Sequence, residues 1–198
     1  MRFTKRRRFY KAAIIALIAP GFFLGCGNKP GILKNLLDSP EHHAMTGFKL
    51  MEKRYLEDAR REFDLALADN PKYSLAHRGL GLLYGIRGDL GAAFRSMNRA
   101  RDCAVTKEES ALAYVGFMRL YTIQNEKGWL RKVEENFCEA SILIKEFSEA
   151  YYEMGIAYKQ AKRLPESEEA FKRVLEINKG LVAEANEELK SLKKLQQE

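Results

Sequence analysis

The side chains best suited to chemistry in this 198-residue chain are its three histidines, its three cysteines and its 27 carboxylates. A metal or catalytic site needs several of them at ligand spacing, or a base beside a nucleophile. His42 and His43 fall in the first turn of an expected helix, His77 falls inside a later one, and no cysteine or carboxylate set has ligand spacing. Acidic pairs such as Glu134 and Glu135 suit solvated helix surfaces. We therefore expect no catalytic residue, metal or cofactor, and a protein that is not an enzyme.

Cys103 and Cys138 lie on two expected helices that would be neighbours in the fold. An oxidising compartment would permit a disulfide between them. Helix axes about 10 Å apart, however, strain the Cα separation of about 5.5 Å that a disulfide needs. The interpretation we favour is two buried apolar thiols, and a bridge is the alternative.

Cys26 ends a segment with the order of an export signal. Residues 1–11 carry six Lys or Arg and no acid, and the uncharged run from Ala12 to Leu24 is too short to cross a hydrocarbon core of about 30 Å. The junction Phe23-Leu24-Gly25-Cys26 resembles a bacterial lipobox, in which a diacylglycerol thioether forms on the cysteine. The resemblance implies a signal peptide over 1–25, and a lipidated Cys26 with a linker over 26–39. The alternative is an uncleaved N-terminal anchor; both tether the chain to a membrane.

Gly27 follows the cysteine. In lipoproteins of this type an Asp there is the usual inner-membrane signal, so the resemblance implies the outer membrane, facing the periplasm. Arg6 and Arg7 also look like a twin-arginine pattern, but we favour general secretion. Removal of the signal lowers Lys plus Arg from 34 to 28 against 27 Asp plus Glu. The formal charge then falls from +7 to about +1, and we expect no nucleic-acid partner.

The remaining chain is repetitive. Four pairs of similar residues lie 34 positions apart: Gly47 and Gly81, Ala59 and Ala93, Phe63 and Met97, and Ala66 and Ala100. In each copy a small residue precedes a large apolar one by 16 positions, as Gly155 precedes Phe171. A further copy pairs Gly116 with Phe137 at 21 positions, which predicts five extra residues in a polar turn at 124–128.

This pattern resembles the tetratricopeptide repeat, a 34-residue helix-turn-helix unit. The resemblance implies an all-α, right-handed solenoid of about four repeats over 40–181, at 40–73, 74–108, 109–147 and 148–181, with a capping helix over 182–198. The third repeat is the irregular one, with Val133 where a small residue is expected and Arg119 where Tyr is usual.

In this family the first helices line a concave groove. The second, fifth, ninth, twelfth and thirteenth positions of each repeat point into it, which selects Phe48, Met51, Arg78, Leu82, Ile86, Phe117, Leu120, Tyr121, Tyr152, Ile156, Lys159 and Gln160. The set is apolar and aromatic with few charges, so we expect an apolar or amphipathic peptide as ligand and no carboxylate clamp. The chain's own segment from Ile32 to Leu37, a second copy in a homodimer, or plain core packing are alternative ways to fill the groove. Trp129 is expected to protrude and to anchor a partner.

These features predict a lipid-anchored scaffold or adaptor that binds another envelope protein, in assembly of a secretion, pilus or outer-membrane complex. The alternative is a targeting or regulatory subunit of a periplasmic hydrolase or protease.

Overall fold

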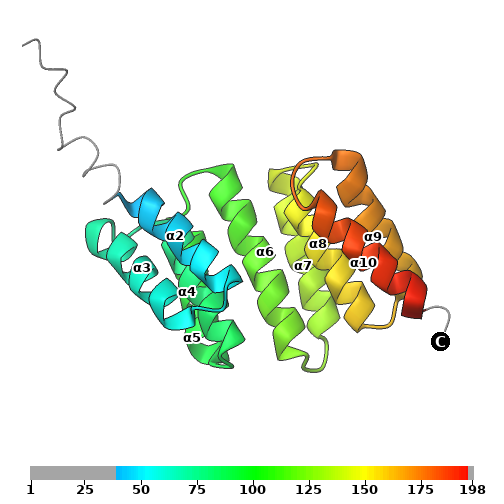
Figure 1. Ribbon diagram of the computed structural model, residues 1–198, viewed down its shortest axis with the longest axis horizontal. Coiled ribbons are helices and arrows are strands. Elements are labelled where there is room, and N and C mark those ends of the chain that lie inside the picture. The colour runs from blue at the N-terminus through cyan, green and yellow to red at the C-terminus, as the bar shows by residue number, and fades with distance from the viewer. Residues whose placement is uncertain (1–38, 196–198) are drawn as a thin grey trace, which may run out of the picture.

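The computed structural model describes residues 39–195, and this part of the chain holds nine helices and no strand (Figure 1). The helices are α2 (Pro40–Glu52), α3 (Leu56–Asp69), α4 (Ser74–Ile86), α5 (Leu90–Cys103), α6 (Lys107–Gln124), α7 (Trp129–Leu143), α8 (Ser148–Gln160), α9 (Leu164–Ile177) and α10 (Val182–Leu195). The predicted all-α solenoid is confirmed. The signal segment, Cys26 and the linker as far as residue 38 lie outside the described residues.

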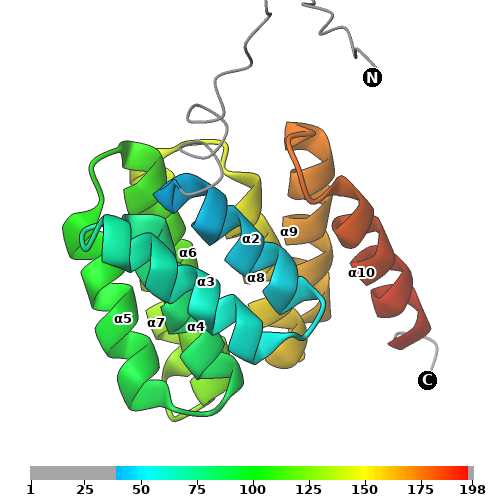
Figure 2. The same ribbon diagram turned by 60° about the vertical axis from the view of Figure 1, so that its left-hand side comes forward.

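The helices form four successive hairpins, α2–α3, α4–α5, α6–α7 and α8–α9, and α10 packs against α9. The first helices of the hairpins also contact one another, α2 with α4, α4 with α6 and α6 with α8. This order runs from one end of the molecule to the other in Figure 1, and in the turned view of Figure 2 the α2–α3 hairpin comes to the front while α10 lies at the right-hand edge. Stacked pairs of this kind bury a continuous core between neighbours.

Polar caps fix where several helices begin. The Ser39 side chain accepts a hydrogen bond from the amide of His42, and Pro40 occupies the first turn of α2. Asp89 caps α5 in the same way. At α6, Thr106 and Glu109 form a reciprocal capping box. These side chains satisfy amide groups that have no partner inside a helix, so the turns are encoded locally.

Glycines admit one large side chain between consecutive hairpins. The ring of Phe63 is fully buried between Gly47 of its own hairpin and Gly79 of the next, and a Cβ on Gly47 would lie 2.6 Å from it. Met97 lies in the same way between Gly81 and Gly116. Close approach of the helices therefore depends on positions without a side chain.

The contact of Gly116 corrects the register of the third repeat. Gly116 lies against Met97 of the preceding hairpin, as Gly79 lies against Phe63, so the predicted pairing of Gly116 with Phe137 is wrong. Gly79 and Gly116 are 37 residues apart, and so are Tyr84 and Tyr121. Tyr121, and not Arg119, thus occupies the usual tyrosine position. The extra residues are shared between an additional first turn of α6, which has 18 residues, and the α6–α7 turn.

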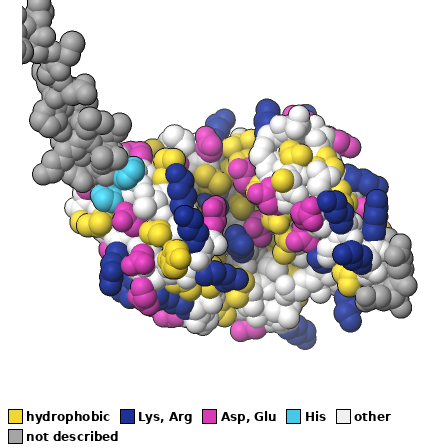
Figure 3. All heavy atoms as spheres, in the orientation of Figure 1, with side chains coloured by type: hydrophobic (Ala, Val, Ile, Leu, Met, Phe, Trp, Pro, Cys, Tyr) yellow, Lys and Arg dark blue, Asp and Glu magenta, His cyan; other side chains and the backbone are white. Residues whose placement is uncertain are grey.

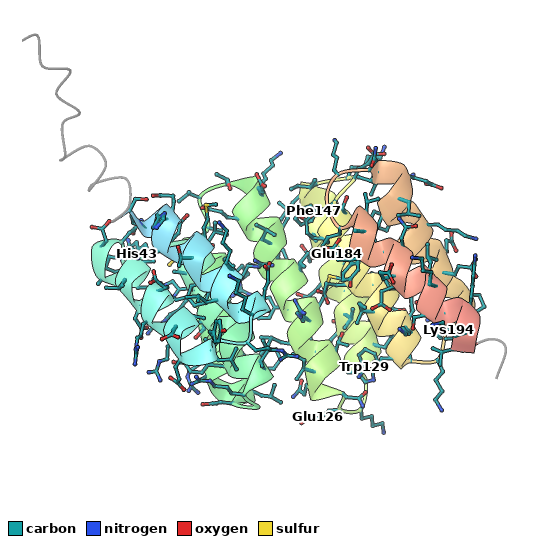
Figure 4. The ribbon with its side chains drawn as sticks, in the orientation of Figure 1. His43, Glu126, Trp129, Phe147, Glu184 and Lys194 are labelled. Atoms are coloured by element: carbon teal, nitrogen blue, oxygen red, sulfur yellow. The ribbon has the colours of Figure 1, made fainter. Side chains whose placement is uncertain are left out.

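Two other expected side-chain environments differ from the structure. Trp129 is half-buried at the start of α7, at one end of the hairpin (Figure 4), and packs against the core around Val133, so it does not protrude. Cys103 is half-buried, Cys138 is exposed, and both are free thiols, so they are neither bridged nor both buried. His77 is buried, with its ring Nε2 2.9 Å from the Pro71 carbonyl.

Within residues 39–195 no helix is long and apolar enough to cross a membrane.

Candidate functional site: the concave groove

The face formed by the first helices is hollowed near its middle, where Figure 3 shows Lys or Arg atoms and hydrophobic side chains together. The hollow, here called the concave groove, has a volume of about 690 Å³. Its lining comes from α2, α4, α6 and α8, the turn after α2 and the turn before α10: Phe48, Met51, Glu52, Arg54, Arg78, Leu82, Ile86, Val115, Arg119, Ile123, Glu149, Tyr152, Glu153 and Leu181.

Some of the residues selected from sequence line this groove together: Phe48, Met51, Arg78, Leu82, Ile86 and Tyr152. They come from three different first helices, so the solenoid brings them to one face. Ile86 is 38% exposed, whereas Leu82 is only 5% exposed and also packs in the core beneath. Ile86 is therefore open to a ligand, and Leu82 supports the floor.

Phe117 and Tyr121 do not line the groove. Phe117 is 5% exposed and stacks on Phe94 at a centroid distance of 6.3 Å, while Tyr121 lies 5.0 Å from the same ring. Leu120 is also buried, against Gly85. The cause is the two-residue register difference in α6. Val115, Arg119 and Ile123 take the groove-facing positions instead.

Ile156 and Lys159 belong to the docking of α10. The ammonium group of Lys159 donates to Glu188 Oε2 at 2.6 Å and to Ser191 Oγ at 2.9 Å, both on α10. Ile156 packs beside the cluster that contains Phe171 and Leu192. Gln160 is also engaged, because its Nε2 donates to the Thr122 carbonyl at 2.9 Å. The concave groove therefore ends before these residues.

Besides Arg78, which was selected from sequence, the groove carries the charges of Arg119 and Glu153. Arg119 Nη1 lies 3.7 Å from Glu153 Oε1, and Arg119 is 55% exposed whereas Glu153 is buried. Arg78 Nε donates to the Leu112 carbonyl at 3.1 Å, and its guanidinium lies 5.3 Å from the centre of the Phe48 ring. The groove lining thus mixes apolar side chains with three arginines and three glutamates, and the expectation of few charges is wrong.

Burial shifts the pKa values of two floor residues in opposite directions. Burial, and next the positive charge of Arg119, lower the pKa of Arg78 to about 10, against the attraction of Glu153. Burial raises the pKa of Glu153, and Arg119 and Arg78 oppose that rise. Arg78 stays protonated at neutral pH because a pKa of about 10 is well above 7. Its guanidinium is a permanent donor for a carboxylate or a carbonyl.

The groove holds groups suited to recognising another protein chain. Guanidinium groups donate hydrogen bonds in a planar fork that matches carboxylates. In the part of the chain that the structure describes, no set of three or more His, Cys, Asp or Glu side chains could hold a metal ion. The sequence analysis did not select Arg119. The signal that could have found it is the 37-residue spacing of Gly79 to Gly116 and of Tyr84 to Tyr121, because the same spacing relates the groove residue Leu82 to Arg119.

Comparison with known proteins agrees with this architecture. A family model described as tetratricopeptide repeat matches residues 148–181, the hairpin of α8 and α9. The thermophilic TPR protein TTC0263 of Thermus thermophilus has a similar structure, with a TM-score of 0.66 and 16% identity over 77% of this chain and 80% of that one. The chain has the tetratricopeptide repeat (TPR) fold.

Two further structures share this TPR fold. That of Pseudomonas aeruginosa pilF gives a TM-score of 0.58 at 18% identity, covering 80% of this chain and 69% of that one. A chain of the APC/C hetero-tetramer Cut9-Hcn1 gives 0.58 at 16% identity over 84% of this chain, which spans only 33% of that one. No curated protein matches the chain in sequence. At these identities the similarity establishes the TPR architecture alone.

Proposed function

We propose that this protein is a lipid-anchored TPR adaptor of the cell envelope, which holds another protein by a short segment bound in the concave groove. The observation that carries the proposal is the groove itself. It offers about 690 Å³ on the face formed by the first helices, with apolar side chains beside the guanidinium groups of Arg78 and Arg119. Sites of this size take ligands of a few residues' bulk, so a short peptide segment fits better than a whole helix.

The lining indicates what such a segment would carry. Ile86 and Ile123 are 38% and 43% exposed at the rim, and Met51 lies near them in the lining, so apolar side chains would be buried there. Beside them, Arg119 is half-exposed, and its guanidinium lies 3.7 Å from the carboxylate of Glu153. An acidic side chain between two apolar ones would place a carboxylate against Arg78 and Arg119.

The envelope location rests on the N-terminal sequence. A basic stretch, an apolar stretch and the small-residue junction before Cys26 support export and lipidation. Gly27 favours the outer membrane, on its periplasmic side. A tethered adaptor there is suited to assembling a secretion, pilus or outer-membrane complex, in which one protein must be held near the membrane while others are added.

The test is photo-crosslinking in cells that carry the full-length protein. A photoreactive amino acid at Ile86 or at Ile123 should join the protein to the same partner. The same amino acid at Leu65, which is 48% exposed on α3 and does not line the groove, should not. Mapping the joined peptide should find a segment with an acidic residue between apolar ones.

Arg119→Met should reduce the adduct from Ile86 about tenfold, since a charge-assisted pair is worth up to about 1.5 kcal/mol. Arg131→Met on α7 is the matched control, because Arg131 is exposed and lies outside the groove lining. Equal adducts from Leu65, or equal losses in the two arginine variants, would contradict groove binding. Leu82 and Phe117 are unsuitable for such tests, because each is 5% exposed and a charge there would disrupt the core.

A further inference from the structure

A second cavity, here called the convex cavity, lies between α7, α8 and α9 and shares no lining residue with the concave groove. Its volume is about 680 Å³. It is lined by Glu134, Phe137, Tyr151, Met154, Tyr158, Glu166, Glu169, Ala170, Lys172, Arg173 and Glu176.

Two substitutions relative to the preceding hairpins open this cavity. Phe94 packs on Tyr121 at the preceding junction, with ring centres 5.0 Å apart. Glu134 stands 40 positions after Phe94, and Tyr158 stands 37 positions after Tyr121. At this junction only a long contact of 3.4 Å joins the Tyr158 hydroxyl to Glu134 Oε1. A carboxylate thus replaces the ring that fills the earlier site.

The second substitution is Glu153. It stands 37 residues after Gly116, the position over which Met97 is buried. Phe137 is the counterpart of Met97 but has no glycine in the next hairpin to lie against. It stays half-buried, 5.1 Å from the ring of Tyr151, and lines the cavity. The apolar floor of the convex cavity is therefore open for a structural reason.

Two arginines of the chain itself already lie against aromatic rings and carboxylates of the cavity walls. The guanidinium of Arg163 lies 4.7 Å from the centre of the Tyr158 ring and donates to Glu134 and Glu166. The guanidinium of Arg173 lies 5.9 Å from the centre of the Tyr151 ring and contacts Glu176. Aromatic faces beside carboxylates attract Lys and Arg.

One ring and one carboxylate of this cavity remain free for a ligand. Among the described residues, no cation lies over the Phe137 ring and no hydrogen bond or ion pair engages Glu169. The lining has four glutamates against one lysine and one arginine, so the charge left over is negative. Met154 and Ala170 add apolar surface between the two walls.

We propose that the convex cavity binds a Lys or Arg side chain from an amphipathic segment of a partner protein. The aliphatic stem packs on Phe137 and Met154, and the charged end pairs with Glu169. This site is independent of the concave groove and differs from it in charge, since the groove lining has as many arginines as glutamates and the convex cavity has an excess of glutamates. A partner could then be held by an acidic segment on one face and a basic one on the other.

The experiment measures binding of two synthetic peptides to the full-length protein in detergent by fluorescence anisotropy. One peptide has a central Arg flanked by Leu, and the other has Glu in its place. The Arg peptide should bind several-fold more tightly, and its affinity should fall as salt rises. Glu169→Gln should weaken it about threefold to fivefold, the size expected for a partly exposed ion pair.

Glu139→Gln is the matched control, because Glu139 is exposed on α7 and does not line the cavity. It should leave the affinity unchanged, and so should Glu149→Gln, because Glu149 lines the concave groove. The proposal fails if both peptides bind equally or if Glu169→Gln has no more effect than Glu139→Gln. It also fails if Glu149→Gln abolishes binding, which would place the peptide in the groove, or if the protein self-associates through this cavity and excludes the peptide.

Discussion

One packing position is occupied by glycine in two hairpins and by glutamate in the last. Gly79 and Gly116 each lie against a fully buried side chain, Phe63 or Met97, of the hairpin before. Glu153 occupies the corresponding position 37 residues after Gly116. That one residue supplies the buried carboxylate of the concave groove and leaves Phe137 exposed to the convex cavity. A single side chain thus shapes both candidate surfaces.

Alanine substitutions at three glycines should rank by what the new methyl group meets. At Gly79 it would lie closer than 3.0 Å to the rigid ring of Phe63, and we expect a loss of about 2–3 kcal/mol. At Gly116 it meets the flexible end of Met97, so the loss should be about 1 kcal/mol. At exposed Gly91 we expect a gain of about 0.5 kcal/mol from helix propensity. Urea unfolding measures all three, and equal values at Gly79 and Gly91 would contradict this packing.

Glu153→Gln should change the pH dependence of stability. Burial raises the pKa of Glu153 above its ordinary 4.5, so the native protein binds this proton more tightly than the unfolded chain. The wild type then loses stability as pH rises from about 4.5 through the raised pKa, and the glutamine variant lacks this loss. The unfolding free energy of the variant minus that of the wild type should therefore increase between pH 4 and pH 7. A difference that is constant over this range would show that the carboxylate has an ordinary pKa.

At the scale of elements, α10 is held by apolar packing and by the polar contacts of one lysine. It has 14 residues, a length at which an isolated helix is marginal in water. Ala185 and Leu192 are buried against Phe171 and Val174 of α9. Lys159 adds the contacts to Glu188 and Ser191. The helix covers the end of the solenoid, where Ile156 would otherwise be exposed.

Leu192→Ala should destabilise the C-terminal end by about 2–4 kcal/mol, because it leaves a cavity in a fully buried site. Amide hydrogen exchange should rise first in α10 and α9 and only later in α2. Lys190→Ala, on the exposed side of the same helix, should stay within about 0.5 kcal/mol of the wild type. Uniform loss of protection along all the helices would indicate instead that the solenoid unfolds as one unit.

At the scale of the whole molecule, the basic charge belongs to the N-terminal segment and the helical part is close to neutral. The proposed export signal contains six of the 34 Lys and Arg residues and none of the 27 acids. Without that segment the chain has almost no excess of basic residues, unlike the strongly basic domains that bind nucleic acids. The lining of the convex cavity has more carboxylates than cationic side chains, whereas the lining of the concave groove has three of each.

Cys26→Ser should abolish acylation and release the protein from membranes, because a serine hydroxyl cannot form the thioether. Fractionation of cells with mass measurement of the N-terminus checks both results. Cys138→Ser is the control, since Cys138 is an exposed thiol on α7 and far along the chain from the signal. A Cys26→Ser protein that keeps residues 1–25 and stays in the membrane would instead support an uncleaved anchor.

The sequence alone determined the helical repeat class, because glycine, alanine and large apolar residues recur at one spacing wherever two helices must approach closely. It also indicated several groove residues of α2, α4 and α8, where the spacing is regular. The register of α6 was decided only in the tertiary structure, since helical periodicity permits a two-residue shift and the contact of Gly116 with Met97 selects one register. That choice placed Arg119 in the groove and Tyr121 in the core. Two other features were also decided by contacts between residues far apart in the sequence. These are the packing of α10 over Lys159 and the open cavity beside Phe137.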